Sequence, residues 1–162
     1  MVKLFGEAKL SARLETLRTV TLFAQLKPRE LRIVDGLLHE RSYLAEEVVF
    51  DEGEDGQALY VVLSGEVLIV HPEGEGEGEG LVARLGHGEF FGDMALIDNW
   101  PRAAQARAAV PTVLGVLFRP DFQTLMSTHA RIASLIALQL AREMGQRLRQ
   151  RVDTASQGRG KL

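Results

Sequence analysis

Gly92, Asp93 and Arg102 are the residues whose types and spacing are best suited to binding a phosphate. Gly92 permits a close turn, and residues 93–96 can form one helical turn whose unpaired backbone N–H groups face an anion. Two alanines follow Arg102 and leave space around a planar guanidinium that can hold two phosphate oxygens. The pattern predicts a phosphate site between this turn and Arg102.

The carboxylate of Asp93 suggests a further contact at the same site. A ribose hydroxyl can donate a hydrogen bond to Asp93 while its phosphate binds the backbone amides and Arg102. Two plainer interpretations stay open at this point. Asp93 is also a good capping residue for a short helix, and Arg102 is also compatible with a surface arginine paired with a neighbouring acid.

Other common site chemistries lack their residues. The chain has no cysteine, which excludes disulfides, cysteine-ligated metal centres and a cysteine nucleophile. Its four histidines are isolated, with no His-x-His or His-Glu-x-x-His pair, and no serine lies in a G-x-S-x-G motif. We therefore expect no metal, no cofactor and no enzymatic activity.

Composition indicates one acidic domain of ordinary type. The chain has 162 residues, a formal charge of −3 and an apolar fraction of 46%, so it can build one core without disulfides or metal. It contains no signal-peptide pattern and no run of about 18 apolar residues, as a membrane helix requires. We expect a cytoplasmic location without a membrane partner.

The elements that must position the phosphate site follow from hydrophobic periodicity. Apolar residues at three- and four-residue spacing predict a helix around residues 10–20 and a second helix beginning near Pro28. Short β-rich runs then predict a sandwich or barrel, and helices return after Pro120. The predicted strands are residues 47–50, 58–63, 66–71, 81–85, 103–110 and 112–118, and the last helices are 121–127 and 130 to about 151.

Two segments are expected to be flexible. Glycine alternates with glutamate over residues 73–80, and such a sequence cannot bury a face, so we expect a mobile hairpin tip between two strands. The polar residues after Val152 are expected to fray.

Residues 91–104, F-G-D-M-A-L-I-D-N-W-P-R-A-A, resemble the phosphate-binding cassette of the cyclic nucleotide-binding domain family. Residues 53–65, G-E-D-G-Q-A-L-Y-V-V-L-S-G, resemble the other signature of this family, and the likeness extends over about residues 22–148. It implies a jelly-roll-like β-roll (a double-stranded β-helix) with N-terminal helices and a long C-terminal helix. The implied ligand-binding residues are Phe91, Gly92, Asp93, Met94, Ala95, Arg102, Ala103 and Ala104.

Three positions bear on how this chain uses the family pattern. The family has glutamate where this chain has Asp93, and complete loss of that hydrogen bond would weaken binding about 10- to 150-fold. In the family, threonine or serine after the arginine often favours guanine, so Ala103 indicates cyclic AMP rather than cyclic GMP. Glu46 stands where the family commonly has glycine, which affects a turn.

The resemblance implies a regulatory sensor without catalysis, divided into four parts. We expect an N-terminal helical segment (1–21), the β-roll with its cassette near 90–105 (22–128), a lid or dimerisation helix (129–152) and a flexible tail (153–162). Only about a dozen mostly polar residues follow Val152, so direct DNA binding through a helix-turn-helix is not expected, and the output would pass to a separate effector protein or through a homodimer. Two alternatives stay open, namely a degenerate scaffold that binds no nucleotide and a truncated transcription regulator of the catabolite activator type.

Overall fold

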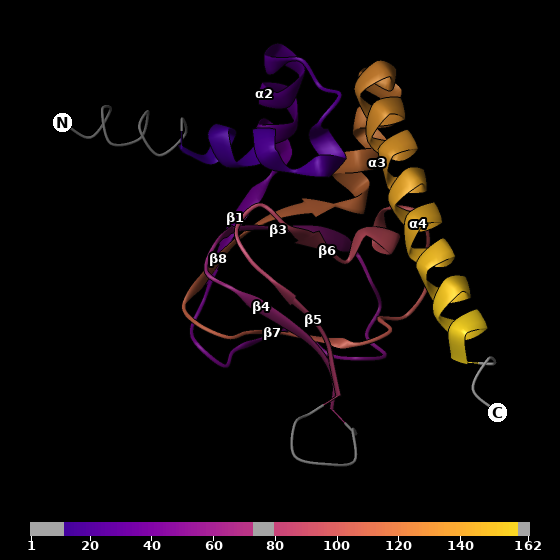
Figure 1. The fold of residues 1–162 in the computed structure, drawn as a ribbon. Helices are drawn as coiled ribbons and strands as arrows, with labels where there is room; N and C mark the ends of the chain where they lie inside the picture. The colour runs from indigo at the N-terminus through magenta and orange to yellow at the C-terminus, as the bar shows by residue number, and fades with distance from the viewer. Residues whose placement is uncertain (1–11, 73–79, 159–162) are drawn as a thin grey trace.

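The computed structural model describes residues 12–72 and 80–158, which form a β-roll with helices at one end and along one side (Figure 1). This confirms the predicted fold class. A helix over residues 12–19 comes first. The later helical elements are η1 (Thr21–Phe23), α2 (Pro28–Leu37), η2 (Asp93–Leu96), α3 (Arg119–Thr128) and α4 (Ala130–Gly158). The strands are β1 (His39–Tyr43), β2 (Val48–Phe50), β3 (Ala58–Ser64), β4 (Val67–His71), β5 (Gly80–Leu85), β6 (Phe90–Phe91), β7 (Gln105–Ala108) and β8 (Thr112–Phe118).

Within the described residues the strands form two antiparallel four-stranded sheets, in the orders β1-β8-β3-β6 and β2-β7-β4-β5. Strand β3 is apolar along nearly its whole length because both of its faces are covered. Leu59 and Val61 pack against the helices, whereas Ala58 and Val62 face the space between the sheets. The roll therefore has two cores, one on each face of the sheet β1-β8-β3-β6. The cassette follows β6, the strand at the edge of that sheet.

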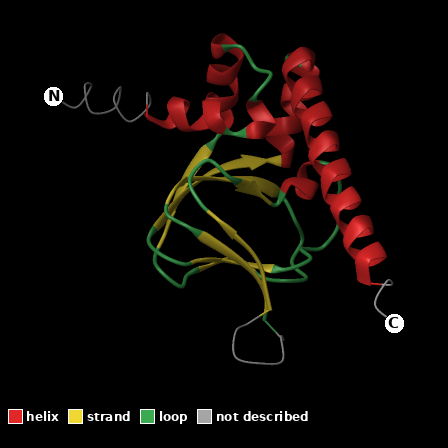
Figure 2. Cartoon of the chain, in the orientation of Figure 1, coloured by secondary structure: helices red, strands yellow, loops and turns green. Residues whose placement is uncertain are grey.

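The helices gather over one sheet because their apolar faces must be buried (Figure 2). Leu17 and Val34, from the helix over residues 12–19 and from α2, are fully buried, as are Ile136 and Leu140 from α4. These side chains form one continuous cluster with Leu59 and the other outward-facing residues of β3. Helix α4 is thus anchored by its first three turns, and its later turns run along the side of the roll (Figure 1).

The prediction missed two short strands, β1 and β6, and ended the last helix too early. Residues 39–43 form strand β1 at the edge of a sheet, although H-E-R-S-Y is polar and largely exposed, as edge strands often are. Helix α4 continues to Gly158, beyond the expected fraying point at 152. The predicted division of the chain otherwise stays a prediction, with parts at 1–21, 22–128 and 129–152.

Strands β4 and β5 pair antiparallel up to His71 and Gly80, so the acidic glycine-rich segment joins two neighbouring strands as predicted. Residues 73–79 themselves lie outside the described residues, as do 159–162. No helix in the described part of the chain is long and apolar enough to cross a membrane.

Candidate functional site

The predicted phosphate turn lies between β6 and η2. Gly92 has a left-handed backbone, with φ of +71°, which glycine adopts without the cost paid by other residues. A Cβ at this position would lie 2.7 Å from Nη1 of Arg102 and 3.1 Å from the carbonyl oxygen of Ala58. Glycine is therefore required here both by the backbone conformation and by the close approach of Arg102.

Arg102 is buried rather than exposed, which rules against its interpretation as a surface arginine. Only 9% of the residue is accessible to solvent. Its Nη2 donates to the carbonyl oxygen of Ala58 at 2.8 Å and its Nη1 to that of Gly92 at 3.2 Å. The guanidinium also lies 4.1 Å from the ring centroid of Phe50, a favourable cation–π distance.

The charge on Arg102 is incompletely compensated. In the part of the chain that the structure describes, no carboxylate lies within ion-pair distance of its guanidinium, and its buried Nε has no hydrogen-bond partner. Burial lowers the pKa of Arg102, and the nearby Tyr60 and Asp93 partly oppose that shift. Because arginine stays protonated in proteins, the site holds a buried cation with no carboxylate at ion-pair distance among the described residues.

A cavity of about 270 Å³ opens beside Arg102 within the roll. Aromatic and acidic residues line it, and these include Tyr43, Phe50, Tyr60, Glu54 and Asp55. Polar and charged groups make up most of the lining, and Phe50 and Tyr60 add aromatic surface. Arg102 thus presents its charge to a space that a ligand can enter.

Asp93 faces helix α4 in this structure. It is 4% exposed, and its two carboxylate oxygens accept hydrogen bonds from Nη1 of Arg147 at 3.1 and 3.2 Å. The N-cap of η2 is Gly92, and Asp93 is the first residue of the helix, so the capping interpretation of Asp93 is not what the structure shows. The carboxylate predicted for a ribose hydroxyl is paired with an arginine from the last helix.

The structure brings the other predicted residues to the same corner of the roll with different exposure. Phe91, Ala95 and Ala104 are buried and pack the cassette against the sheet, whereas Met94 is 43% exposed and Ala103 is exposed. The buried members shape the turn, and the exposed members remain available for contact. Their roles in ligand binding stay predictions.

Sequence reasoning missed two arginines that contact the cassette. Arg147 follows the buried Leu140 by seven residues and the partly buried Met144 by three, spacings that share one helix face. That spacing was the available signal for a cation directed at the roll. Arg119 begins α3 and donates to Ala95 O at 2.5 Å, and no feature of the sequence marked that contact in advance.

Comparison with known proteins shows which family this chain resembles in sequence. The family described as cyclic nucleotide-binding domain matches residues 40–129. The Cyclic AMP receptor protein of Thermus thermophilus is 38% identical over 76% of this chain and 56% of its own length. The cAMP-dependent protein kinase regulatory subunit of Aspergillus fumigatus is 34% identical over 68% of this chain and 26% of its own.

A solved structure gives the same correspondence in three dimensions. The crystal structure of Thermus thermophilus catabolite activator protein matches with a TM-score of 0.74 and 37% identity, over 84% of this chain and 63% of that chain. The chain spans about half of the curated receptor and about a quarter of the kinase subunit. The matched region includes the cassette and the strands that carry it.

Proposed function

The chain belongs to the cyclic nucleotide-binding domain family, and from this premise we propose that it is a sensor that binds cyclic AMP and signals to a separate effector protein through helix α4. The observation that carries the proposal is Arg102, a buried guanidinium without a carboxylate partner in the described structure, beside a cavity. No catalytic role is proposed for the site.

The phosphate of a cyclic nucleotide supplies the anion that Arg102 lacks. A cyclic phosphodiester carries one negative charge on two free oxygens, which matches the fork of a guanidinium. Arg102 donates to two carbonyl groups, and its Nε has no partner among the described residues. Binding would give the guanidinium a charge-assisted pair with the phosphate oxygens.

The choice of cyclic AMP rests on Ala103 and on the relatives. Ala103 carries no hydroxyl that would favour a guanine base, as the family resemblance implies. The Thermus receptor and the Aspergillus kinase subunit are both named for cyclic AMP. These are grounds for expecting cyclic AMP to bind more tightly than cyclic GMP.

We propose that helix α4 transmits the signal because its Arg147 binds Asp93, the carboxylate that a ribose hydroxyl would use. Arg147 pairs with Asp93 in the structure, and the side chain of Arg147 is 48% exposed. A ribose hydroxyl that donates to Asp93 competes with Arg147 for the same oxygens. Nucleotide binding would then favour a state in which the later turns of α4 move away from η2, which is how preferential binding produces coupling.

The later part of α4 also offers the surface for an effector or a second copy of the chain. Leu148 is 64% exposed and Val152 is 56% exposed, four residues apart on one helix face. These two exposed apolar side chains are where we propose that a partner contacts α4. We place the output in that contact rather than in direct binding of DNA.

A scaffold that binds no nucleotide is the second candidate. Its supporting observation is the Asp93–Arg147 pair, because the shorter carboxylate of aspartate is already occupied. In that case the Asp93–Arg147 ion pair would hold α4 against η2 at all times, and α4 would not move.

Titration calorimetry with nucleotide-free protein separates the two candidates. The proposal predicts saturable binding of cyclic AMP, weaker binding of cyclic GMP and loss of both with Arg102→Ala, whereas Arg18→Ala serves as the matched control at an exposed pair with Glu15. Absence of binding by the unaltered protein would support the scaffold instead.

Movement of α4 can be followed in the same protein. Trp100 is the only tryptophan and the chain has no cysteine, so a dansyl group on Gln150→Cys accepts energy from Trp100 alone. Transfer should change on saturation with cyclic AMP, and a label on Ser42→Cys in β1 should change less. Identical transfer with and without bound nucleotide would contradict the proposed role of α4.

A further inference from the structure

Arg119 connects three segments that meet behind the phosphate turn. It is the first residue of α3, directly after β8. Its Nε donates to Ala95 O at 2.5 Å and its Nη2 to Asp98 O at 2.8 Å. Nη1 donates to Oδ1 of Asn99, and Nη2 also donates to the carbonyl oxygen of Gly56. One side chain therefore contacts η2, the loop that follows η2, and the turn before β3.

The backbone of Arg119 strengthens the same junction. Its N–H donates to the carbonyl oxygen of Gln57 at 2.8 Å, next to the Gly56 carbonyl that its side chain contacts. Carbonyl groups at the end of a short helix lack helical partners and interact favourably with a cation. Arginine suits this position because its donors are arranged in a rigid fork, and a lysine ammonium cannot reproduce that geometry.

The junction extends to Arg102 through Gly56. A Cβ on Gly56 would lie 3.1 Å from Cβ of Ala95 and 3.3 Å from Cζ of Arg102, so the backbone of Gly56 is closely packed between them. By fixing Gly56 and Ala95 together, Arg119 limits where Arg102 and the phosphate turn can lie relative to one another. Displacement of any of these groups by 1 Å would spoil a two-oxygen contact with phosphate.

We propose that Arg119 is the positioning residue of the cassette, which holds η2 and its following loop against the Gly56 turn in the geometry that receives the nucleotide phosphate. This inference rests on the proposed function for its ligand. It assigns Arg119 no contact with the nucleotide. The residue acts through Gly56, Ala95 and the loop that carries Trp100.

The test compares Arg119→Ala, Arg119→Lys and the control Arg18→Ala. We expect Arg119→Ala to bind cyclic AMP at least tenfold more weakly by calorimetry at a temperature where circular dichroism shows it folded. Arg119→Lys should lie between it and the unaltered protein, at least threefold weaker, because one ammonium reaches fewer of the four oxygens. The control should bind within twofold of the unaltered protein.

Trp100 gives a readout that does not need the ligand. It is 75% exposed and follows Asn99 directly, so its quenching by acrylamide in nucleotide-free protein reports the position of the loop. We expect altered quenching in both Arg119 variants and unaltered quenching in the control Arg18→Ala. This readout also separates the two proposals, because it tests Arg119 even if the unaltered protein binds no nucleotide.

Folded Arg119→Ala with unaltered Trp100 quenching, or with unaltered affinity in a protein that binds cyclic AMP, would overturn the inference. If Arg119→Ala does not fold, Arg119→Lys decides the question in the same two measurements. If Arg119→Lys gives the same Trp100 quenching and the same affinity as the unaltered protein, the guanidinium fork has no positioning role.

Discussion

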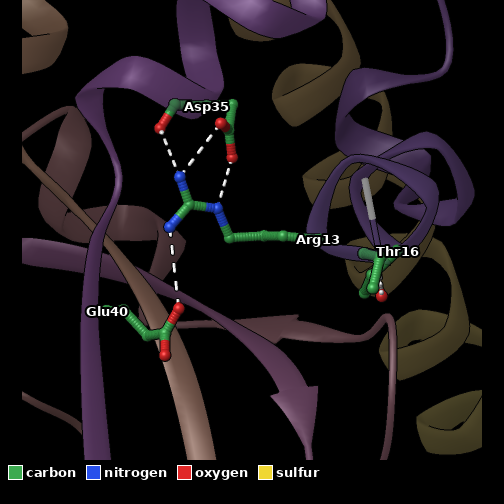
Figure 3. A network of polar contacts seen from close by, with 5 residues as sticks. Arg13, Thr16, Asp35 and Glu40 are labelled. Carbon is green, nitrogen blue, oxygen red and sulfur yellow. Dashed lines mark hydrogen bonds and ion pairs between the residues drawn. The ribbon is translucent and has the colours of Figure 1, made fainter. Parts of the chain in front are cut away.

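Arg13 and Arg102 are arginines with opposite surroundings. Arg13 donates from Nε to Oδ1 of Asp35 at 2.5 Å and from Nη2 to Oδ2 at 2.9 Å, and its Nη1 lies 3.6 Å from Glu40 (Figure 3). Arg102 meets two carbonyl groups and an aromatic ring, without a carboxylate at ion-pair distance in the described structure.

The pKa values of the two side chains shift in opposite directions. The hydrogen bonds and charge of Asp35 raise the pKa of Arg13 despite partial burial, whereas burial lowers the pKa of Arg102. A compensated cation joins the helix over residues 12–19 to α2 and β1 and has a structural role. An uncompensated buried cation costs free energy in the empty protein, and a bound anion recovers part of that cost. This difference is the ground on which we assign the nucleotide phosphate to Arg102.

The largest effect is expected from Arg102→Ala. Removal of two charge-assisted hydrogen bonds to phosphate, each worth about 1.5–3 kcal/mol, should weaken cyclic AMP binding about 10²- to 10⁴-fold. Calorimetry measures the loss, and circular dichroism checks the fold. Retention of affinity within tenfold would show that the uncompensated charge is not the ligand contact.

Arg13→Ala should alter stability and leave binding unchanged. It leaves Asp35, which is 5% exposed, without its arginine, at a cost of about 1.5–3 kcal/mol. Because Asp35 raises the pKa of Arg13, this contact stabilises the fold below the ordinary arginine pKa as long as the Asp35 carboxylate is ionised, which includes pH 6 and pH 9. Urea unfolding should therefore give the same difference in free energy of unfolding between the unaltered protein and Arg13→Ala at pH 6 and at pH 9. An unchanged midpoint of unfolding would remove the distinction between the two arginines.

Arg147→Ala tests whether the ion pair between Arg147 and Asp93 competes with the nucleotide. It removes the competitor for Asp93 without touching Arg102. Since a half-exposed ion pair is worth up to about 1 kcal/mol, cyclic AMP should bind about 2- to 5-fold more tightly. Arg149→Ala, on the same helix, is the matched control. Weaker binding in Arg147→Ala would indicate that Arg147 contacts the nucleotide rather than competing with it.

The smallest effect concerns the exposed Glu46 and its ion pair with Arg107. Nε of Arg107 lies 3.6 Å from Oε2 of Glu46, which is 70% exposed, so the pair contributes little. Glu46 has φ of +68° in the turn before β2, a conformation that costs a non-glycine residue about 1–2 kcal/mol. Glu46→Gly should therefore raise the free energy of unfolding by about 0.5 kcal/mol, measured by urea titration. A decrease would mean that this ion pair outweighs the backbone strain.

Much of the fold was predictable because its signals are local. Alternating and continuous apolar runs located β3, β4 and β8, and Pro28 marked the first turn of α2. Strand β1 was missed because an edge strand with an exposed face needs no apolar pattern. Helix α4 was underestimated because its final turns have no buried side chain to mark them.

The site was predictable in part for the same reason. Gly92, Asp93 and Arg102 lie within eleven residues of sequence, so their pattern was visible in one window. Arg147 is 54 residues from Asp93, and Arg119 is 63 residues from Gly56. Such contacts depend on how α3 and α4 pack against the roll, and no local motif encodes that packing.

The most direct test of the central claim measures thermal unfolding of nucleotide-free protein, Arg102→Ala and Arg13→Ala with and without cyclic AMP. Ligand at about 100 times its Kd should add about 2.7 kcal/mol of stability to the unaltered protein. The account predicts that Arg13→Ala begins at a lower Tm and gains the same increment, whereas Arg102→Ala gains at most about 0.4 kcal/mol. An equal gain in Arg102→Ala would contradict the assignment of its buried charge to the phosphate.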